Sequence, residues 1–99
     1  IGGEDAPKPG EGPSREKREN GNYDVLFCAD VDNKVIKASV AGDMDPGYGS
    51  TSKMITESAV CLLKEADDLP GGIYTPASSL GKRLIKRLQD NAGLIFKVE

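Results

Sequence analysis

The sequence contains no histidine and no tryptophan, and these absences limit the chemistry of the chain. Without histidine it lacks the commonest general base, any Ser-His or Cys-His pair, and histidine-based metal sites. Apolar residues make up 37% and aromatic residues 5% of the 99 positions, which is little for an independent enzyme. A domain of this size buries only about two-thirds of its unfolded surface. Any catalysis within the chain would therefore use tyrosine, lysine or carboxylates.

Long apolar runs and an excess of positive charge are also absent. No run approaches the roughly 18 apolar residues that a membrane helix needs, so no membrane span is expected. The formal net charge is −3, which offers no overall basic surface to a nucleic acid. Residues 1–20 are charged and rich in proline and glycine, unlike a secretory signal. These features predict a soluble, cytoplasmic protein without a nucleic-acid partner.

Cysteine is scarce, with Cys28 in a predicted strand and Cys61 in a predicted helix. Two cysteines without histidine make a poor zinc site, so no metal is expected. A disulfide would need the two Cα atoms within about 7 Å, which a sequence cannot establish. We expect both thiols to be reduced and unpaired.

Residues 1–21 are predicted to form an extended arm. The first thirteen residues contain four glycines and three prolines and show no hydrophobic periodicity. A short helix over residues 14–20 is an open alternative, with Ser14 as its cap and Gly21 closing it in the left-handed region. The charges of this segment fit a solvated face equally well.

Residues 22–99 are predicted to form one α+β domain. Residues 22–29 and 35–41 are rich in β-branched and aromatic side chains, and turn residues separate them, which predicts an antiparallel hairpin. Residues 94–98 predict a last strand after the breaker Gly93. The expected fold is a small antiparallel sheet in the order strand, strand, helix, helix, strand, with the two helices on one face.

The stretch of residues 42–63 predicts a tight turn that leads into the most apolar helix of the sequence. Pro46 ends the preceding strand, and Gly47 and Gly49 admit positive φ. The hydroxyls at residues 50–52 can cap the new helix. Two adjacent helical rows are largely apolar, so we expect this helix to be mostly buried. The rows are Met54, Ser58 and Leu62, and Ile55, Ala59 and Leu63.

A second helix begins at Pro76, where the missing amide costs nothing, with Thr75 at the cap. Leu80, Leu84 and Leu88 form its apolar row. Lysine and arginine occupy the opposite face, which predicts a solvated surface.

The best candidate site is the turn before the first long helix. Its predicted ligand-contacting residues are Tyr48, Gly49, Ser50 and Thr51. Free backbone amides, hydroxyls and the helix dipole there would all suit an anion. The alternative is that these residues only form the turn and the cap. Neither a P-loop nor a GxGxxG pattern is present, so the chain shows no dinucleotide fingerprint.

Three motifs together carry a resemblance to a known family. The sequence resembles the C-terminal part of saccharopine dehydrogenase-like oxidoreductases, most closely the branch that includes the trans-acting enoyl reductases. The motifs are Lys8-Pro9-Gly10-Glu11-Gly12-Pro13-Ser14 with Arg18 and Gly21, then Gly42-Asp43 to Lys53 with Glu57-Ser58-Ala59, and Gly72-Ile73-Tyr74-Thr75-Pro76-Ala77.

The resemblance implies a longer parent polypeptide in which an N-terminal Rossmann domain holds NAD(P). That domain is missing here, so the chain itself is expected to bind no cofactor and to be inactive alone. No catalytic residue is assigned by the three motifs. The expected partners are the Rossmann domain of the parent and, as an open alternative, a second copy in a homodimer. The competing function is a structural or association module with no ligand of its own.

Overall fold

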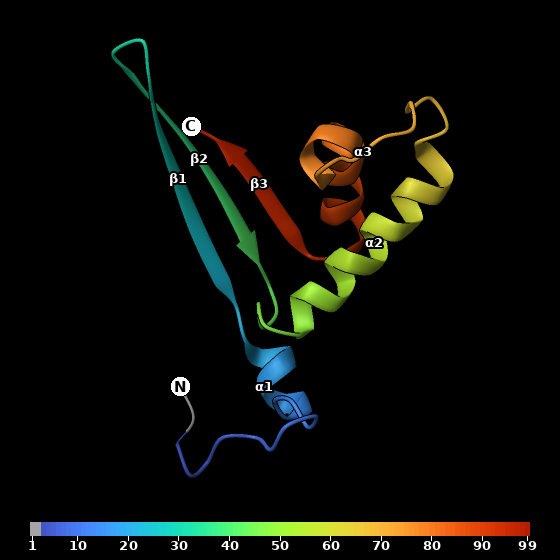
Figure 1. Cartoon of the computed structure of the whole chain (residues 1–99). Coiled ribbons are helices and arrows are strands. Elements are labelled where there is room, and N and C mark those ends of the chain that lie inside the picture. The colour runs from blue at the N-terminus through green and yellow to red at the C-terminus, as the bar shows by residue number, and fades with distance from the viewer. Residues whose placement is uncertain (1–2) are drawn as a thin grey trace.

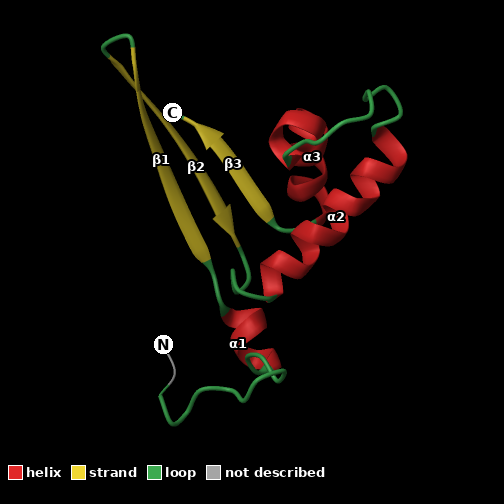
Figure 2. Ribbon diagram, viewed as in Figure 1, coloured by secondary structure: helices red, strands yellow, loops and turns green. Residues whose placement is uncertain are grey.

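Within residues 3–99, which the computed structural model describes, helices and strands follow the predicted order after a short additional helix (Figures 1 and 2). Ile1 and Gly2, which belong to the predicted arm, lie outside the described residues. The α+β class and the antiparallel sheet are confirmed. The elements are α1 (Arg15–Asn20), β1 (Tyr23–Val31), β2 (Lys34–Gly42), α2 (Gly49–Glu65), α3 (Pro76–Asn91) and β3 (Leu94–Val98).

The β1–β2 hairpin closes through a two-residue turn at Asp32 and Asn33. Both residues take positive φ, 50° and 63°, as a type I′ turn requires. Aspartate and asparagine tolerate this conformation better than other side chains do, and the turn matches the twist of the strands. The predicted hairpin is therefore confirmed, and β2 goes on to pair with β3 to give the strand order β1-β2-β3.

The register places most of the apolar side chains of the three strands on one face of the sheet, which we call the inner face. Residues opposite each other in an antiparallel pair share a face, so Val25, Val40 and Phe96 form one row across the sheet. Val40 and Phe96 also pack against the buried core, so the inner face is the side toward the helices. The inner face comprises Tyr23, Val25, Phe27, Ala29, Val31, Lys34, Ile36, Ala38, Val40, Gly42, Leu94, Phe96 and Val98.

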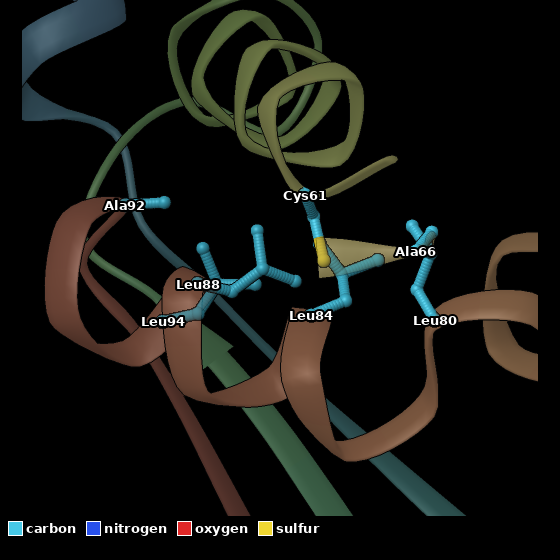
Figure 3. Close-up of a cluster of buried hydrophobic side chains, with 7 residues drawn as sticks. All are labelled: Cys61, Ala66, Leu80, Leu84, Leu88, Ala92 and Leu94. Atoms are coloured by element: carbon cyan, nitrogen blue, oxygen red, sulfur yellow. The ribbon is translucent and has the colours of Figure 1, made fainter. Parts of the chain in front are cut away.

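The core lies where α2, α3 and β3 meet (Figure 3). Leu80, Leu84 and Leu88 of α3 are each at most 8% exposed, which confirms the predicted leucine row. Leu84 and Leu88 lie near Cys61 of α2, whose side chain is completely buried, and Leu80 lies beside Ala66. Ala66, Ala92 and Leu94 complete this cluster. Cys28 and Cys61 are both unpaired, as expected, and burial raises the pKa of the Cys61 thiol.

Capping residues determine where α3 begins and ends. The Thr75 and Ser78 side chains form a capping box, and Pro76 occupies the first turn. Gly93 takes φ +69° after the helix, which confirms its predicted role as a breaker. Gly81 has φ 50° and ψ −128° and interrupts the helical backbone inside α3, a break that the hydrophobic pattern does not indicate.

Ion pairs join α3 to α2 and to the loop that follows α2. Arg87 donates to Glu57 at 2.8 Å and to Glu65 at 3.2 Å. Arg83 donates to both carboxylate oxygens of Asp68, at 2.6 and 2.7 Å, and these bonds lower the pKa of the Asp68 carboxyl. Part of the basic row of α3 therefore serves helix packing rather than an open solvated face.

The expectation that α2 is mostly buried is wrong. Leu62 is 57% exposed and Leu63 is 77% exposed, and the buried residues of α2 are Gly49, Ser50 and Cys61. The reason is that α2 packs mainly on α3, while the hairpin and the helix pair diverge from their common base (Figure 1). The radius of gyration is 16.4 Å, against about 13 Å for a compact domain of about 100 residues.

Within residues 3–99, no helix combines the length and the apolar character that crossing a membrane requires.

The exposure pattern predicts which leucines stabilise the chain. We expect Leu88→Ala to lower the free energy of unfolding by about 2–5 kcal/mol, because it leaves a cavity in the core. The matched control Leu63→Ala, which truncates an exposed leucine of α2, should change it by no more than about 0.5 kcal/mol. Urea unfolding at neutral pH measures both values, and equal losses would contradict the burial described above.

Candidate functional site

The turn before α2 is organised by the carboxylate of Asp45. Its oxygens accept hydrogen bonds from the backbone amides of Gly47 at 3.2 Å, Tyr48 at 2.7 Å and Gly49 at 3.1 Å. The backbone carbonyl of Asp45 also accepts from the amide of Ser50 at 2.7 Å. The bond from the Tyr48 amide, followed by that from Gly49, holds the pKa of the Asp45 carboxyl below its ordinary value.

Asp45 therefore caps α2, in place of the hydroxyls expected at residues 50–52. Its negative charge lies where the helix dipole favours an anion, and it occupies the amides that the sequence suggested were free. The prediction that the backbone N–H groups at this helix N-terminus are free is therefore wrong for Gly47, Tyr48 and Gly49. The carboxylate of Asp45 itself supplies the anion for which the turn is suited.

The glycines near this turn are needed because other backbone segments pack closely against them, not because they take positive φ. Gly47 and Gly49 do not take the positive φ that was expected of them, and neither does Gly21 at the end of α1. A Cβ at Gly49 would lie 2.7 Å from the Arg18 carbonyl oxygen. A Cβ at Gly21 would lie 2.7 Å from the Cα of Asp45. These contacts bring α1 directly against the start of α2.

The four residues that the sequence suggested as ligand contacts differ in their exposure and in their hydrogen bonds. Ser50 is completely buried, and its hydroxyl lies 2.8 Å from the Tyr23 hydroxyl of β1. Gly49 is buried beside it, and the Thr51 hydroxyl donates to the Pro46 carbonyl at 2.5 Å. Tyr48, at 60% exposed, presents its side chain at the surface. Ligand contact by these residues stays a prediction, and Tyr48 is the one best placed for it.

Tyr48 lies in a surface depression formed with the N-terminal arm, which we call the arm groove. A cavity of about 480 Å³ is lined by residues 10–13 of the arm together with Arg18, Tyr48 and Ser52. A neighbouring cavity of about 570 Å³ is lined by arm residues, Asp45, Gly47 and Tyr48. The Arg18 guanidinium donates to the Pro13 carbonyl at 2.8 Å, so it ties the arm to α1.

The arm groove combines few but distinct polar groups. The Tyr48 hydroxyl can donate or accept a hydrogen bond, and Arg18 retains N–H donors beyond the one bonded to Pro13. Such donors suit a carbonyl or carboxylate oxygen. Among the described residues, no group of three or more Cys, Asp or Glu side chains could hold a metal ion. Within residues 3–99, each buried side-chain nitrogen or oxygen has a hydrogen-bond partner.

Arg18 is the groove residue that reasoning from local patterns did not select. Its segment was predicted to be an extended arm or a marginal helix, whereas α1 forms with Ser14 as its cap. The Ser14 hydroxyl accepts from the Lys17 amide at 3.3 Å, which confirms the alternative of a short helix. The available signal was the first motif of the resemblance, which contains Arg18.

Comparison with known proteins finds trans-acting enoyl reductases that are similar to the chain. The chain is 38% identical over 85 residues, 83% of its length, to the "Putative trans-acting enoyl reductase" of Mycobacterium tuberculosis. It is 34% identical over 93 residues, 91% of its length, to a trans-acting enoyl reductase of Mycobacterium bovis. It is 35% identical over 85 residues to the trans-acting enoyl reductase of Mycobacterium ulcerans.

These alignments cover only part of each relative. The chain spans about a fifth of the length of the curated relatives it matches, between 20% and 22% in these three cases. No family model matches the chain, and no solved structure matches it. The similarity therefore relates the chain to a piece of these proteins.

The cap at Asp45 predicts a pH dependence of stability. Because the folded state lowers the pKa of this carboxyl, its stabilising contribution is complete above the unfolded-state pKa of about 3.9. That contribution is lost as the pH falls through the lower, folded-state pKa. We expect Asp45→Asn to be less stable than the wild type at pH 7 and to lose less stability on acidification. Urea unfolding at neutral and acidic pH measures this.

The matched control for this experiment is Asp30→Asn, which makes the same change of charge at an exposed position of β1. It should leave the acid sensitivity of the chain almost unchanged. An Asp45→Asn variant with the same pH profile as the wild type would show that the carboxylate does not cap α2.

Proposed function

We propose that this chain is the C-terminal region of a larger NAD(P)-dependent oxidoreductase of the trans-acting enoyl reductase type, itself related to the saccharopine dehydrogenase-like enzymes. The support is the 34–38% identity over most of the chain to proteins about four times as long. The incomplete burial of α2 also suits a region that packs against further polypeptide. Three sequence motifs in the expected order add to the proposal.

NAD(P) belongs, in this proposal, to a Rossmann domain elsewhere in the parent polypeptide. The residues described here do not fit a dinucleotide. The sequence lacks a GxGxxG pattern, and the Asp45 carboxylate occupies the amides at the start of α2 that a pyrophosphate would need. An anionic phosphate would have to displace a carboxylate already held by three amides. We therefore derive no cofactor step for this chain.

The arm groove is the part of the chain that we assign to substrate contact in the parent enzyme. An enoyl group carries a carbonyl oxygen, which accepts hydrogen bonds from donors such as the Tyr48 hydroxyl and the Arg18 guanidinium. Ser50 and Gly49 would not contact the substrate but would hold the start of α2, and with it Tyr48, in position. The observation that carries this assignment is the convergence of Tyr48 and Arg18 in one groove.

The second candidate function is an association module without a ligand of its own. It is favoured by the large apolar side chains that remain exposed on the sheet and on α2. In that case the turn before α2 only caps the helix, and the arm groove has no role in substrate binding. The two functions predict different kinetics for the parent enzyme: substitutions in the arm groove lower kcat/KM if the groove contacts substrate and leave it unchanged if the chain is an association module.

The absent dinucleotide fingerprint predicts the behaviour of the isolated chain with cofactor. Titration of the 99-residue chain with NADPH, followed by nicotinamide fluorescence, should give no saturable binding, whereas the longer parent protein should bind. Saturable binding by the isolated chain in the low micromolar range would refute the assignment of the cofactor to a separate domain.

The groove assignment predicts a kinetic effect of Tyr48→Phe in the parent enzyme. Loss of one substrate hydrogen bond of about 0.5–1.5 kcal/mol should lower kcat/KM by about 2- to 10-fold. The melting temperature should not change, because the Tyr48 ring stays in place at the surface. The matched control Tyr74→Phe removes a hydroxyl that bonds the Pro70 carbonyl outside the groove, and it should leave kcat/KM unchanged. Unchanged kinetics in Tyr48→Phe would favour the association module.

A further inference from the structure

The inner face of the sheet is largely apolar, but a helix covers it only at β3. Among its thirteen residues, Lys34 at the hairpin tip is the only charged one. Leu94 is buried and Val40 and Phe96 pack against the core, yet Phe27 is 54% and Val98 is 80% exposed. The opposite face carries charges on each of the three strands, beside the exposed apolar side chains of Leu26, Val35 and Ile95. The charged outer residues include Asp24 and Asp30 of β1, Lys37 of β2 and Lys97 of β3.

The chain exposes more surface than a compact monomer of its mass, and the excess is as large as a protein–protein interface. The accessible surface is 7736 Å², whereas a folded monomer of this mass, 10.5 kDa, exposes about 5400 Å². The excess of about 2300 Å² compares with the roughly 1000–2500 Å² that each partner contributes to a large permanent interface. The extended arm contributes part of this excess, and the uncovered apolar side chains contribute another part. A soluble monomer rarely leaves such a face open.

The uncovered part of the inner face has the width of one helix. A helix with its side chains is about 10 Å across, and neighbouring strands are about 4.8 Å apart, so one helix covers about two strands. α3 packs against β3, and α2 packs on α3, which leaves β1 and β2 without a helix (Figure 2). These nine-residue strands are about 30 Å long, the length of a helix of about 20 residues.

The flank of α3 supplies a second apolar wall beside this space. A cavity of about 470 Å³ lies between α3 and Phe96. Its lining is almost entirely apolar and includes Ala77, Leu84, Ile85 and Leu88. A helix placed over β1 and β2 would contact this flank at the usual helix spacing of about 8–10 Å. Sheet and helix together form an open apolar channel.

We propose that one amphipathic helix of the parent polypeptide lies along β1 and β2, with its apolar stripe on the inner face of the sheet and one edge against α3. This inference rests on the proposed parent, whose relatives are about four times as long as the chain and so have polypeptide to supply the helix. A second copy of the chain is a poorer occupant through the basic face of α3 or the outer face of the sheet, because both faces carry charges. A helix with a wide apolar stripe fits both walls.

Thiol labelling of the full-length parent protein tests the proposal, because β1 offers matched positions on its two faces. In Val25→Cys the new thiol points to the inner face, while the native Cys28 lies exposed on the outer face of the same strand. Buried Cys61 reports whether the variant is folded. We expect a maleimide reagent to label position 25 at least about tenfold more slowly than Cys28, because labelling would need local opening of the covering helix.

The outcomes separate the possible occupants. Equal labelling of positions 25 and 28 with Cys61 protected would overturn the proposal. Protection of position 25 that appears only in an oligomer, as judged by size-exclusion chromatography with light scattering, would also overturn it in favour of a second copy. The exposed row of α2 with Ile55 and Leu62 would be the candidate insert in that case. If Val25→Cys fails to fold, Ala29→Cys on the same face replaces it. Labelling needs no reductase activity, so its result is independent of the substrate assignment.

Discussion

The arrangement of the chain depends on one junction, where the Asp45 carboxylate accepts the amides that begin α2. The Asp45 amide donates to the Arg18 carbonyl at 3.0 Å, and its carbonyl accepts from Ser50, so α1 and α2 are both tied to the same residue. The bond between Ser50 and Tyr23 adds β1. Because the hairpin and the helix pair diverge from this point, its geometry sets the angle between them and shapes the arm groove (Figure 1).

The parts of the fold that the sequence predicted well are those determined by neighbouring residues. The hairpin turn needs only Asp32 and Asn33, and the start of α3 needs only Thr75, Pro76 and the residues of its first turn. The burial of α2 was predicted wrongly for a physical reason. Hydrophobic periodicity indicates which side of a helix avoids water, but not whether the polypeptide that covers it belongs to the same stretch of chain. Leu62 fits the pattern and still lies exposed.

The candidate site was predictable only in outline. Glycines, a tyrosine and hydroxyls at a helix N-terminus indicated the right turn, and Tyr48 does face a groove. The capture of the amides by Asp45 depends on a side-chain conformation that the pattern leaves open. The contribution of Arg18 depends on α1 folding against α2, a contact between segments far apart in the chain. Long-range contacts of this kind bring the groove together, and no local signal encodes them.

The pairing of β2 with β3 has a consequence for how the chain folds. Gly42 pairs with Leu94 across both long helices, so forming this ladder closes a loop of about 50 residues, at an entropic cost that grows with the logarithm of loop length. The hairpin and the helix pair close much shorter loops and form local contacts early. β3 then joins the two units, since it bonds to β2 and packs against α3. We therefore expect the arrival of this short strand to be the slow step that turns two local structures into one domain.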